Sequence, residues 1–377
     1  MECAIVGVGQ TAYVRGAGKS TMGLALEACK NALLDAALVP ADIDGVILFW
    51  LDEPISTHPL ALSLGIPQVD WQLTIAGGGF NGPGIITTAS AAIQAGLCRS
   101  VLCLHAANRF SARAERFAND NRGSNLTAPF GLSAPPQNFA LWAQRHMFEY
   151  GTTVEQLGEI AVTCRQHASL NPRALMQEPF TIEEYLDSRM ITSPFRLLDC
   201  CLETDGAAAC IVTSLERARD LPHPPVQILG GVCNASGPAA HDGRTGSEYT
   251  SMGSRFLAQK LWAQSGVGPS EMDFAQLYDC FTFTVLSQLE DLGYCAKGEG
   301  GPFVEGGRLR LGGELPTNTS GGHLSEGYVR SMNLVNEGVR QLRHEFAGSA
   351  RQVPNAKLGV VTGAPVPGSA IVIARVD

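Results

Sequence analysis

The sequence predicts a layered α/β protein built from two similar halves. Short apolar runs that read as strands alternate with amphipathic runs that read as helices, which is typical of mixed α/β layers with mostly parallel strands. The second observation is an internal repeat. Residues 35–49 (DAALVPADIDGVILF) and 264–278 (QSGVGPSEMDFAQLY) each read as a helix end, a proline turn, an acidic turn and a buried strand. Because the flanking elements also match in order, duplication explains the repeat better than chance does.

The first half opens with a strand at 4–13 and an amphipathic helix at 21–37, which lead into the first copy of the repeated turn. A glycine turn then leads into a small-residue helix at 77–96, and a strand follows at 100–106. Residues 107–195 are first polar and rich in proline, then helical, which indicates a helical and loop insertion. A buried strand within 197–214 completes this half.

The second half repeats the order. A strand at 226–236 and a helix at 253–265 precede the second proline turn. A glycine turn again leads into a helix within 320–338, and the strands 357–363 and 368–376 close the chain. We therefore predict two domains, an N-terminal half at 1–225 that contains the insertion at about 107–195, and a C-terminal half at 226–377.

Composition excludes several classes of function. The 377 residues carry a formal net charge of −9, which argues against the basic stripe of a nucleic-acid-binding protein. We find neither an apolar run long enough for a membrane span nor a signal peptide, so we expect a cytoplasmic protein. The eleven cysteines include no C-x-x-C pair, so neither a metal site nor a disulfide framework is expected. No dinucleotide or phosphate-loop fingerprint is complete, so we expect no cofactor in this chain.

Several motifs resemble those of the thiolase superfamily, in its sterol-carrier-protein-x or lipid-transfer-protein branch. The motifs are YDCF at 278–281, NTSGGHLSEGY at 318–328, the run at 193–218 and LEDLGYCAKGEGG at 289–301. The resemblance covers essentially the whole chain. It implies the thiolase fold, with duplicated βαβαβαββ halves in five α-β-α-β-α layers. It also implies a homodimer that acts on acyl-CoA thioesters.

The chain departs from the thiolase pattern at the four positions that carry thiolase chemistry. Gly79 stands where those enzymes have a nucleophilic cysteine, and Tyr278 where they have a histidine or asparagine. Tyr328 replaces a second histidine and Thr362 replaces a second cysteine. Because glycine offers no nucleophile, the usual covalent acyl-enzyme is excluded at that position.

Retro-aldol cleavage of a thioester needs no nucleophile. It needs a base for the β-hydroxyl proton, donors for the enolate oxygen and a proton source for the α-carbon, which two phenols and an oxyanion hole could supply. The paired tyrosines resemble those of thiolase-like aldolases that cleave steroid side chains. Those enzymes convert a 17-hydroxy steroid with a short acyl-CoA side chain into a ketosteroid and propionyl-CoA. They work with a small OB-fold and zinc-ribbon partner protein.

The sequence thus predicts a thiolase-fold aldolase, with a non-catalytic acyl-CoA or lipid carrier and an acyltransferase as alternatives. We expect Asp279 to cap the helix that follows it, and His323 to be a surface imidazole within reach of substrate. Gly79 and Ala364 are expected to offer backbone N–H groups to the thioester oxygen. The predicted catalytic residues are Tyr278 and Tyr328, and the predicted oxyanion or substrate-binding residues are Gly79, His323, Ala364 and Asp279.

Overall fold

The computed structural model describes residues 2–50, 55–76, 81–113, 128–132, 134–235 and 249–376. The first part of the chain forms β1 (Cys3–Gln10), α1 (Thr21–Asp35), β2 (Gly45–Trp50), α2 (Thr57–Leu64), β3 (Trp71–Ala76), α3 (Gly82–Gln94) and β4 (Ser100–Asn108). The insertion forms α6 (Pro135–Tyr150), α7 (Val154–Ser169), α8 (Ile182–Asp187), β5 (Met190–Thr192) and β6 (Phe195–Arg196), and β7 (Asp205–Ser214) and α9 (Leu215–Ala218) follow. The remainder forms β8 (Val226–Ala235), α10 (Ser254–Ser265), β9 (Phe274–Gln276), α11 (Thr282–Asp291), α12 (Gly300–Val304), α13 (Gly322–Ser325), α14 (Met332–Leu342), β10 (Leu358–Pro365) and β11 (Gly368–Arg375).

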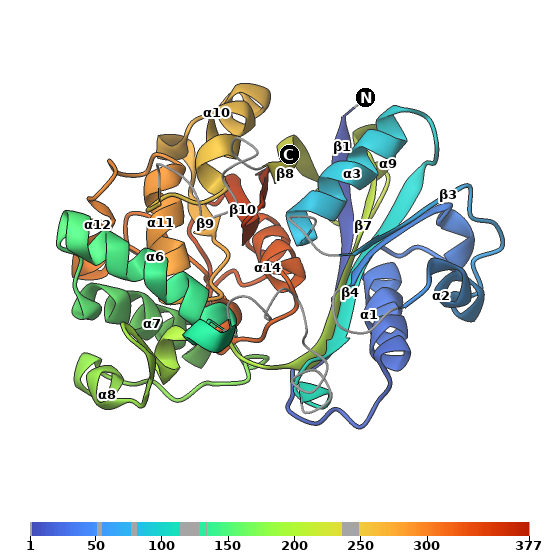
Figure 1. Ribbon diagram of the computed structural model, residues 1–377. Coiled ribbons are helices and arrows are strands. Elements are labelled where there is room, and N and C mark those ends of the chain that lie inside the picture. The colour runs from blue at the N-terminus through green and yellow to red at the C-terminus, as the bar shows by residue number, and fades with distance from the viewer. Residues whose placement is uncertain are drawn as a thin grey trace.

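The described strands of the large sheet follow the order β3-β2-β4-β7-β1-β8-β11-β10-β9. Figure 1 shows α1 and α2 on the outer side of the first five strands, and α10 and α11 on the outer side of the last four. Between the two sets of strands lie α3 and α14, whose apolar residues pack on both sets in one central core. The chain therefore has the five layers α-β-α-β-α that the resemblance implied.

The two sets of strands have the same internal order. Counted from one edge of the sheet, the N-terminal set is β3-β2-β4-β7-β1. Counted from the other edge, the C-terminal set is β9-β10-β11-β8, which corresponds to β2-β4-β7-β1. In the place of β3, the C-terminal set has a single parallel bridge from Thr317 to Ala275 of β9. The repeated aspartates explain why the turns match. The carboxylate of Asp44 accepts hydrogen bonds from the backbone N–H groups of residues 99 and 100, at the start of β4. The carboxylate of Asp273 accepts from those of residues 357 and 358, at the start of β10.

The expectation of mostly parallel strands is wrong. Among the described pairs of the large sheet, β3–β2, β2–β4 and β10–β9 are parallel, whereas the other five are antiparallel. The reason lies in the last strands of each half. A tight turn joins β10 to β11, and β7 returns from the insertion to lie between β4 and β1. Alternation of strands and helices along the sequence does not reveal such antiparallel returns.

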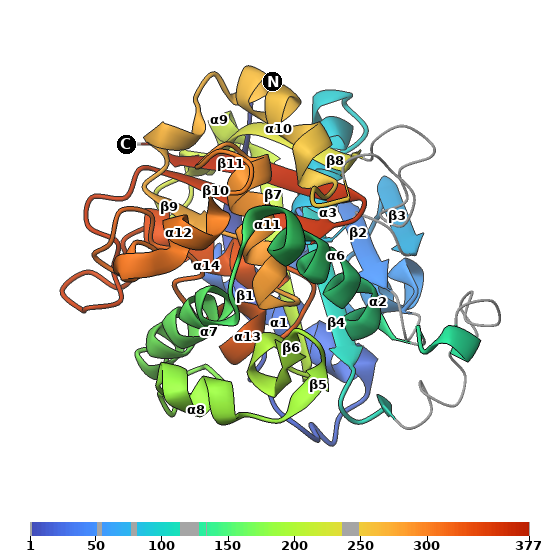
Figure 2. The same ribbon diagram turned by 60° about the vertical axis from the view of Figure 1, so that its left-hand side comes forward.

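The insertion covers the outer side of the C-terminal strands. Helices α6 and α7 share one apolar core with α10 and α11, and Figure 2 shows them in front of that part of the sheet. Phe281, three residues after Tyr278, stacks on Phe195 of the insertion at a centroid distance of 5.1 Å, with ring planes 2° apart. The insertion therefore packs directly against the segment that carries Tyr278. Within the described residues, no helix is both long and apolar enough to cross a bilayer.

Candidate active site

Two buried tyrosines of the C-terminal half meet in the core that this half shares with the insertion. Tyr278 follows β9, and Tyr328 lies in the connection between α13 and α14. Their side chains are 2 % and 3 % exposed, and their hydroxyl oxygens are 2.5 Å apart. This distance is at the short end for an O–H···O hydrogen bond, so the two phenols can pass a proton between them. The structure therefore brings together the two residues predicted to be catalytic.

The main chain of Tyr278 is fixed by two side chains that the sequence analysis did not assign to this task. The Thr362 hydroxyl accepts a hydrogen bond from the Tyr278 N–H at 2.8 Å and donates one to the Gln288 Oε1 at 2.6 Å. The Gln288 Nε2 in turn donates to the Tyr278 carbonyl at 2.7 Å. Thr362, which replaces a cysteine of the thiolase pattern, thus helps to hold one member of the tyrosine pair.

His323 is not a surface residue, contrary to the expectation from its glycine-rich surroundings. It is fully buried, and its ring packs edge-on against both tyrosines at centroid distances of 4.8 and 4.9 Å. Its Nε2 accepts a hydrogen bond from the Ser331 N–H at 3.2 Å. Burial lowers the pKa of His323 to about 3, so the imidazole is neutral at pH 7. Its Nδ1 lies 3.1 Å from an oxygen of the Asp279 carboxyl group, so the ring contacts both phenols and the residue next to Tyr278.

Asp279 is a capping residue, but not of the helix that follows it in sequence. Its carboxylate accepts hydrogen bonds from the backbone N–H groups of His323 at 2.9 Å and Leu324 at 3.2 Å, in the first turn of α13. Burial raises its pKa to about 7, although these two N–H groups act in the opposite direction. Gly322 permits the close approach, since it has a φ of +60° and a Cβ there would lie 2.1 Å from the carboxylate. Asp279 thereby ties the Tyr278 segment to the segment before Tyr328.

The two expected backbone donors differ in outcome. Gly79 lies outside the described residues. Ala364 lies in β10, half-buried and packed at the edge of the C-terminal core. The neighbouring Gly363 is close to Asn81 and Ser369, because a Cβ on it would meet both side chains. Asn81 immediately precedes α3 and is 1 % exposed.

Several polar atoms around this point have no hydrogen-bond partner among the described residues. Both amide atoms of Asn81 and the hydroxyls of Ser331 and Ser369 are buried without a hydrogen bond to any part of the chain that the structure describes. Buried polar atoms are rarely left without a hydrogen bond. These residues therefore form a candidate site for a small polar group of a ligand. The sequence analysis missed Asn81, although it directly follows the glycine turn that was singled out.

Two arginines lie against Tyr328. The guanidinium carbons of Arg109 and Arg330 are each 5.0 Å from the centre of its ring. Burial raises the pKa of Tyr328, and the positive charges of Arg330 and Arg109 partly offset this effect. Burial also raises the pKa of Tyr278 well above its ordinary value. Sequence reasoning missed both arginines, although Arg330 lies only two positions after Tyr328.

Two thiols lie near the phenols. The backbone N–H of Cys201 donates a hydrogen bond to the Cys280 carbonyl, so the two residues are adjacent beside the site. Burial raises the pKa of Cys201 to about 11 and that of Cys280 well above its usual range. Since the thiolate is the reactive form of cysteine, both side chains are poor nucleophiles at neutral pH.

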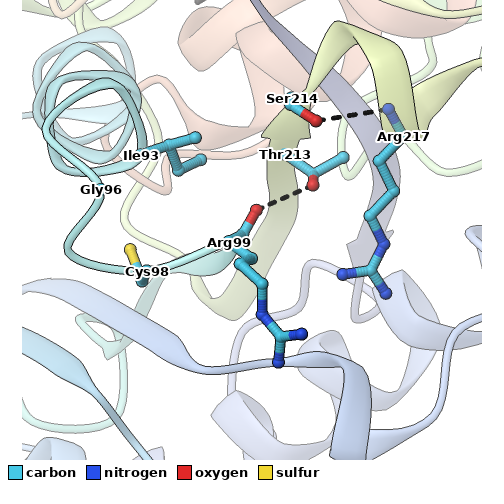
Figure 3. Close-up of a pocket in the computed structure, with 7 residues that line it drawn as sticks. All are labelled: Ile93, Gly96, Cys98, Arg99, Thr213, Ser214 and Arg217. Carbon is cyan, nitrogen blue, oxygen red and sulfur yellow. Dashed lines mark hydrogen bonds between the residues drawn. The ribbon is translucent and has the colours of Figure 1, made fainter.

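A separate cavity of about 440 Å³ lies at the other end of β4 and β7, and Figure 3 shows the residues around it. Its two arginines are already paired. Arg99 binds Asp44 at 2.9 Å, and Arg217 binds Asp42 at 2.8 Å. The Thr213 hydroxyl donates a hydrogen bond to the Arg99 carbonyl, which links β7 to the residue before β4 beside the cavity. It is not the candidate active site, because it lies at the far end of these strands from Tyr328.

The five layers and the buried tyrosine pair define a protein with the architecture of a thiolase and a site suited to proton transfer. A family model described as thiolase C-terminal domain-like matches residues 240–374. A steroid side-chain-cleaving aldolase of Thermomonospora curvata is 40% identical to this chain, over 97% of this chain and 96% of that protein. A 17-hydroxy-3-oxo-4-pregnene-20-carboxyl-CoA lyase of Mycobacterium tuberculosis is 38% identical, with 97% and 98% covered.

A solved structure agrees with these relatives. The Ltp2-ChsH2(DUF35) aldolase superposes with a TM-score of 0.91 at 39% identity, over 99% of this chain and 98% of that chain. The chain therefore belongs to the thiolase superfamily, in its sterol-carrier-protein and thiolase-like branch. Within that branch it is an enzyme of the aldolase type. The family and the fold expected from the sequence are confirmed.

Proposed function

We propose that the protein cleaves a carbon–carbon bond of a β-hydroxyacyl-CoA by a retro-aldol reaction, with Tyr278 and Tyr328 as its proton-transfer pair. The observation that carries the proposal is the 2.5 Å contact between two buried phenols at positions where thiolases keep other catalytic groups. The raised pKa values of the neighbouring thiols also count against covalent catalysis, and so against an acyltransferase.

The step balances as a relay of protons. The substrate's β-hydroxyl gives its proton to one phenol as the bond between the α- and β-carbons breaks. The β-carbon becomes a ketone, and the bonding electrons form the thioester enolate. The first phenol passes its own proton to the second, which protonates the α-carbon. Both tyrosines are protonated before and after the reaction.

The relay agrees with the acidity of the site. A free tyrosine has a pKa of about 10, so a resting phenolate at pH 7 would cost about 4 kcal/mol even without burial. Burial raises the pKa of both tyrosines and makes a resting phenolate costlier still. A pair of neutral phenols that accepts one proton while releasing another avoids this cost.

The enolate oxygen needs hydrogen-bond donors. The unpartnered amide of Asn81 supports a position for this oxygen between the start of α3 and β10. Gly79 and Ala364 are proposed to contribute backbone N–H groups there, as the resemblance implied. His323 and Asp279 are assigned a supporting role, because the first packs against the phenols and the second joins their two segments.

The proposed substrate is a 17-hydroxy steroid with a short acyl-CoA side chain, cleaved to a ketosteroid and propionyl-CoA. The names of the two relatives support this substrate class. A small OB-fold and zinc-ribbon partner is proposed because the similar solved aldolase pairs Ltp2 with ChsH2(DUF35). A homodimer is proposed because β3 is an edge strand with the exposed residues Gln72, Leu73 and Thr74, and such edges favour pairing.

The test is incubation of the protein with 17-hydroxy-3-oxo-4-pregnene-20-carboxyl-CoA and a zinc-ribbon partner, without free CoA. A lyase releases ketosteroid and propionyl-CoA in equal amounts, both measured by liquid chromatography and mass spectrometry. A carrier binds the thioester and releases neither product. An acyltransferase needs added CoA and leaves an acyl group on a side chain during turnover. Either of the last two results overturns the proposal.

A further inference from the structure

We propose that Arg330 makes the tyrosine pair competent, because its guanidinium stabilises the negative charge that the phenols carry during proton transfer. Arg330 is thus a positioning residue that acts through Tyr278 and Tyr328. The inference deepens the proposed function, and for the reaction itself it rests on that function. Its effect on the acidity of the phenols does not depend on any substrate.

The geometry relates Arg330 to both phenols at once. Its guanidinium carbon lies 5.0 Å from the centre of the Tyr328 ring, and its Nη1 lies 3.5 Å from the Tyr278 hydroxyl oxygen. A cation close to an aromatic ring interacts with its electrons, and an opposite charge within about 4–6 Å favours an ionised phenol. Arg109 adds a second guanidinium carbon at 5.0 Å from the same ring. Charge that develops on the pair would therefore face two cations.

The backbone of Arg330 is held in an unfavourable conformation. Arg330 and Ser331 have φ values of +52° and +64°, in a left-handed region that residues other than glycine, asparagine and aspartate rarely adopt. The Gly82 N–H donates to the Arg330 carbonyl at 3.0 Å, and the Ser331 N–H donates to His323. These contacts fix the strained turn. Observed strain of this kind concentrates at functional sites, and here it orients a guanidinium toward the phenols.

The groups near the pair other than the arginines are two thiols, an imidazole and two carboxyl groups. The side chains of Cys201, Cys280 and His323 are neutral there, given the directions of their pKa shifts. The carboxyl groups are Asp279, which burial leaves partly ionised at neutral pH by raising its pKa to about 7, and Glu203, whose charge acts on Cys201 beside the pair. The arginines are therefore the groups that favour charge on the phenols most directly.

The test replaces Tyr328 by 3,5-difluorotyrosine, whose more acidic phenol can be titrated by absorbance without substrate. The charge of Arg330 is removed with Arg330→Asn, because asparagine tolerates a positive φ and keeps the turn. Arg330→Lys retains the charge. Arg113→Gln is the matched control, since Arg113 also lies over an aromatic ring, that of Phe110 at 4.8 Å.

We expect Arg330→Asn to raise the pH midpoint of the phenol by about 1–2 units, Arg330→Lys to restore part of the shift, and Arg113→Gln to change nothing. Urea unfolding should show that Arg330→Asn is as stable as the parent. With a tyrosine at position 328, kcat of Arg330→Asn should fall about 10–100-fold with KM within about threefold. Its pH–rate profile should move to higher pH.

An unchanged phenol midpoint in a folded Arg330→Asn protein overturns the inference. So does a loss expressed only in KM, which would make Arg330 a contact for the CoA phosphates instead. Failure of the proposed function is recognised separately. In that case the parent protein releases no ketosteroid, while the titration without substrate still decides what Arg330 does to the phenols.

Discussion

The tyrosine pair allows a sharp test through a cycle of Tyr278→Phe, Tyr328→Phe and the double variant. Either single change removes the 2.5 Å hydrogen bond and leaves one buried hydroxyl without that partner. The cost in stability should be about 1–3 kcal/mol. Loss of a positioned acid–base group should lower kcat by about 10²–10⁴-fold, or about 3–5 kcal/mol in the barrier.

The double variant distinguishes a relay from two independent groups. A relay fails when either hydroxyl is missing, so the double variant should be about as slow as the slower single variant. The double variant should also lose less free energy of unfolding than the sum of the losses of the two single variants, because it removes both hydroxyls and leaves neither of them without its partner. The assays are the rate of propionyl-CoA release and urea unfolding of each variant.

Tyr294→Phe is the control for removing a buried hydroxyl. The Tyr294 hydroxyl makes no hydrogen bond within the described parts of the chain, so its loss should leave turnover and stability near those of the parent. The reasoning is refuted if Tyr328→Phe turns over normally. It is also refuted if the two losses in kcat multiply in the double variant, because the tyrosines would then act separately.

Four further predictions concern the surroundings of the pair. His323 has a pKa of about 3 in the folded chain and about 6.5 in the unfolded chain. Below about pH 6.5 the unfolded chain therefore binds a proton that the folded chain does not, and the free energy of unfolding falls as the pH drops toward 3. In His323→Asn, urea unfolding at several pH values should show a weaker dependence of the free energy of unfolding on pH across that window, by up to about 1.4 kcal/mol per pH unit. If the dependence on pH were unchanged, the imidazole would be charged in the folded chain. Thr362→Val should lose about 1–3 kcal/mol in the free energy of unfolding and most of the turnover, because it lacks the hydroxyl that binds Tyr278 and Gln288. Thr362→Ser should retain both stability and turnover. If the two variants behaved alike, the hydroxyl would not hold Tyr278. Cys280→Ala should keep its turnover, and an inactive but folded variant would reopen covalent catalysis. Leu73→Lys on the exposed edge strand β3 should give a monomer in analytical ultracentrifugation, and a persistent dimer would place the interface elsewhere.

The fold was largely predictable because its signals are local or repeated. The proline turns at 40 and 269 both became short 3-10 turns, and the aspartates that follow them both bind the start of a neighbouring strand. The helices and strands that were predicted lie within a few residues of their observed bounds, whereas α2 and β3 were not predicted. Strand direction was not predictable, since it depends on where β7 and β11 insert between strands that are distant in sequence.

The candidate site was predictable only where a residue stands at a catalytic position of the thiolase pattern. Tyr278 and Tyr328 were found in that way, although their separation of fifty residues gave no direct sign of a hydrogen bond. The burial of His323 was missed because it results from α7 and the tyrosines packing around the turn, and glycine-rich sequence alone suggests exposure. Arg109 was missed for a similar reason, because it contacts Tyr328 from the segment that directly follows β4, far away in the sequence.

Thr362 shows why a list of lost catalytic groups does not by itself describe a new site. Sequence comparison marks it as a missing cysteine, which suggests only that an activity has been lost. In the structure its hydroxyl accepts from the Tyr278 N–H and donates to Gln288, which in turn donates to the Tyr278 carbonyl. A thiol, with its weak and long hydrogen bonds, is poorly suited to this task. Thr362 and Tyr278 therefore belong to one hydrogen-bonded unit. Restoring a cysteine at this position would weaken the support of Tyr278 without recreating a thiolase, because position 79 would still lack a nucleophile.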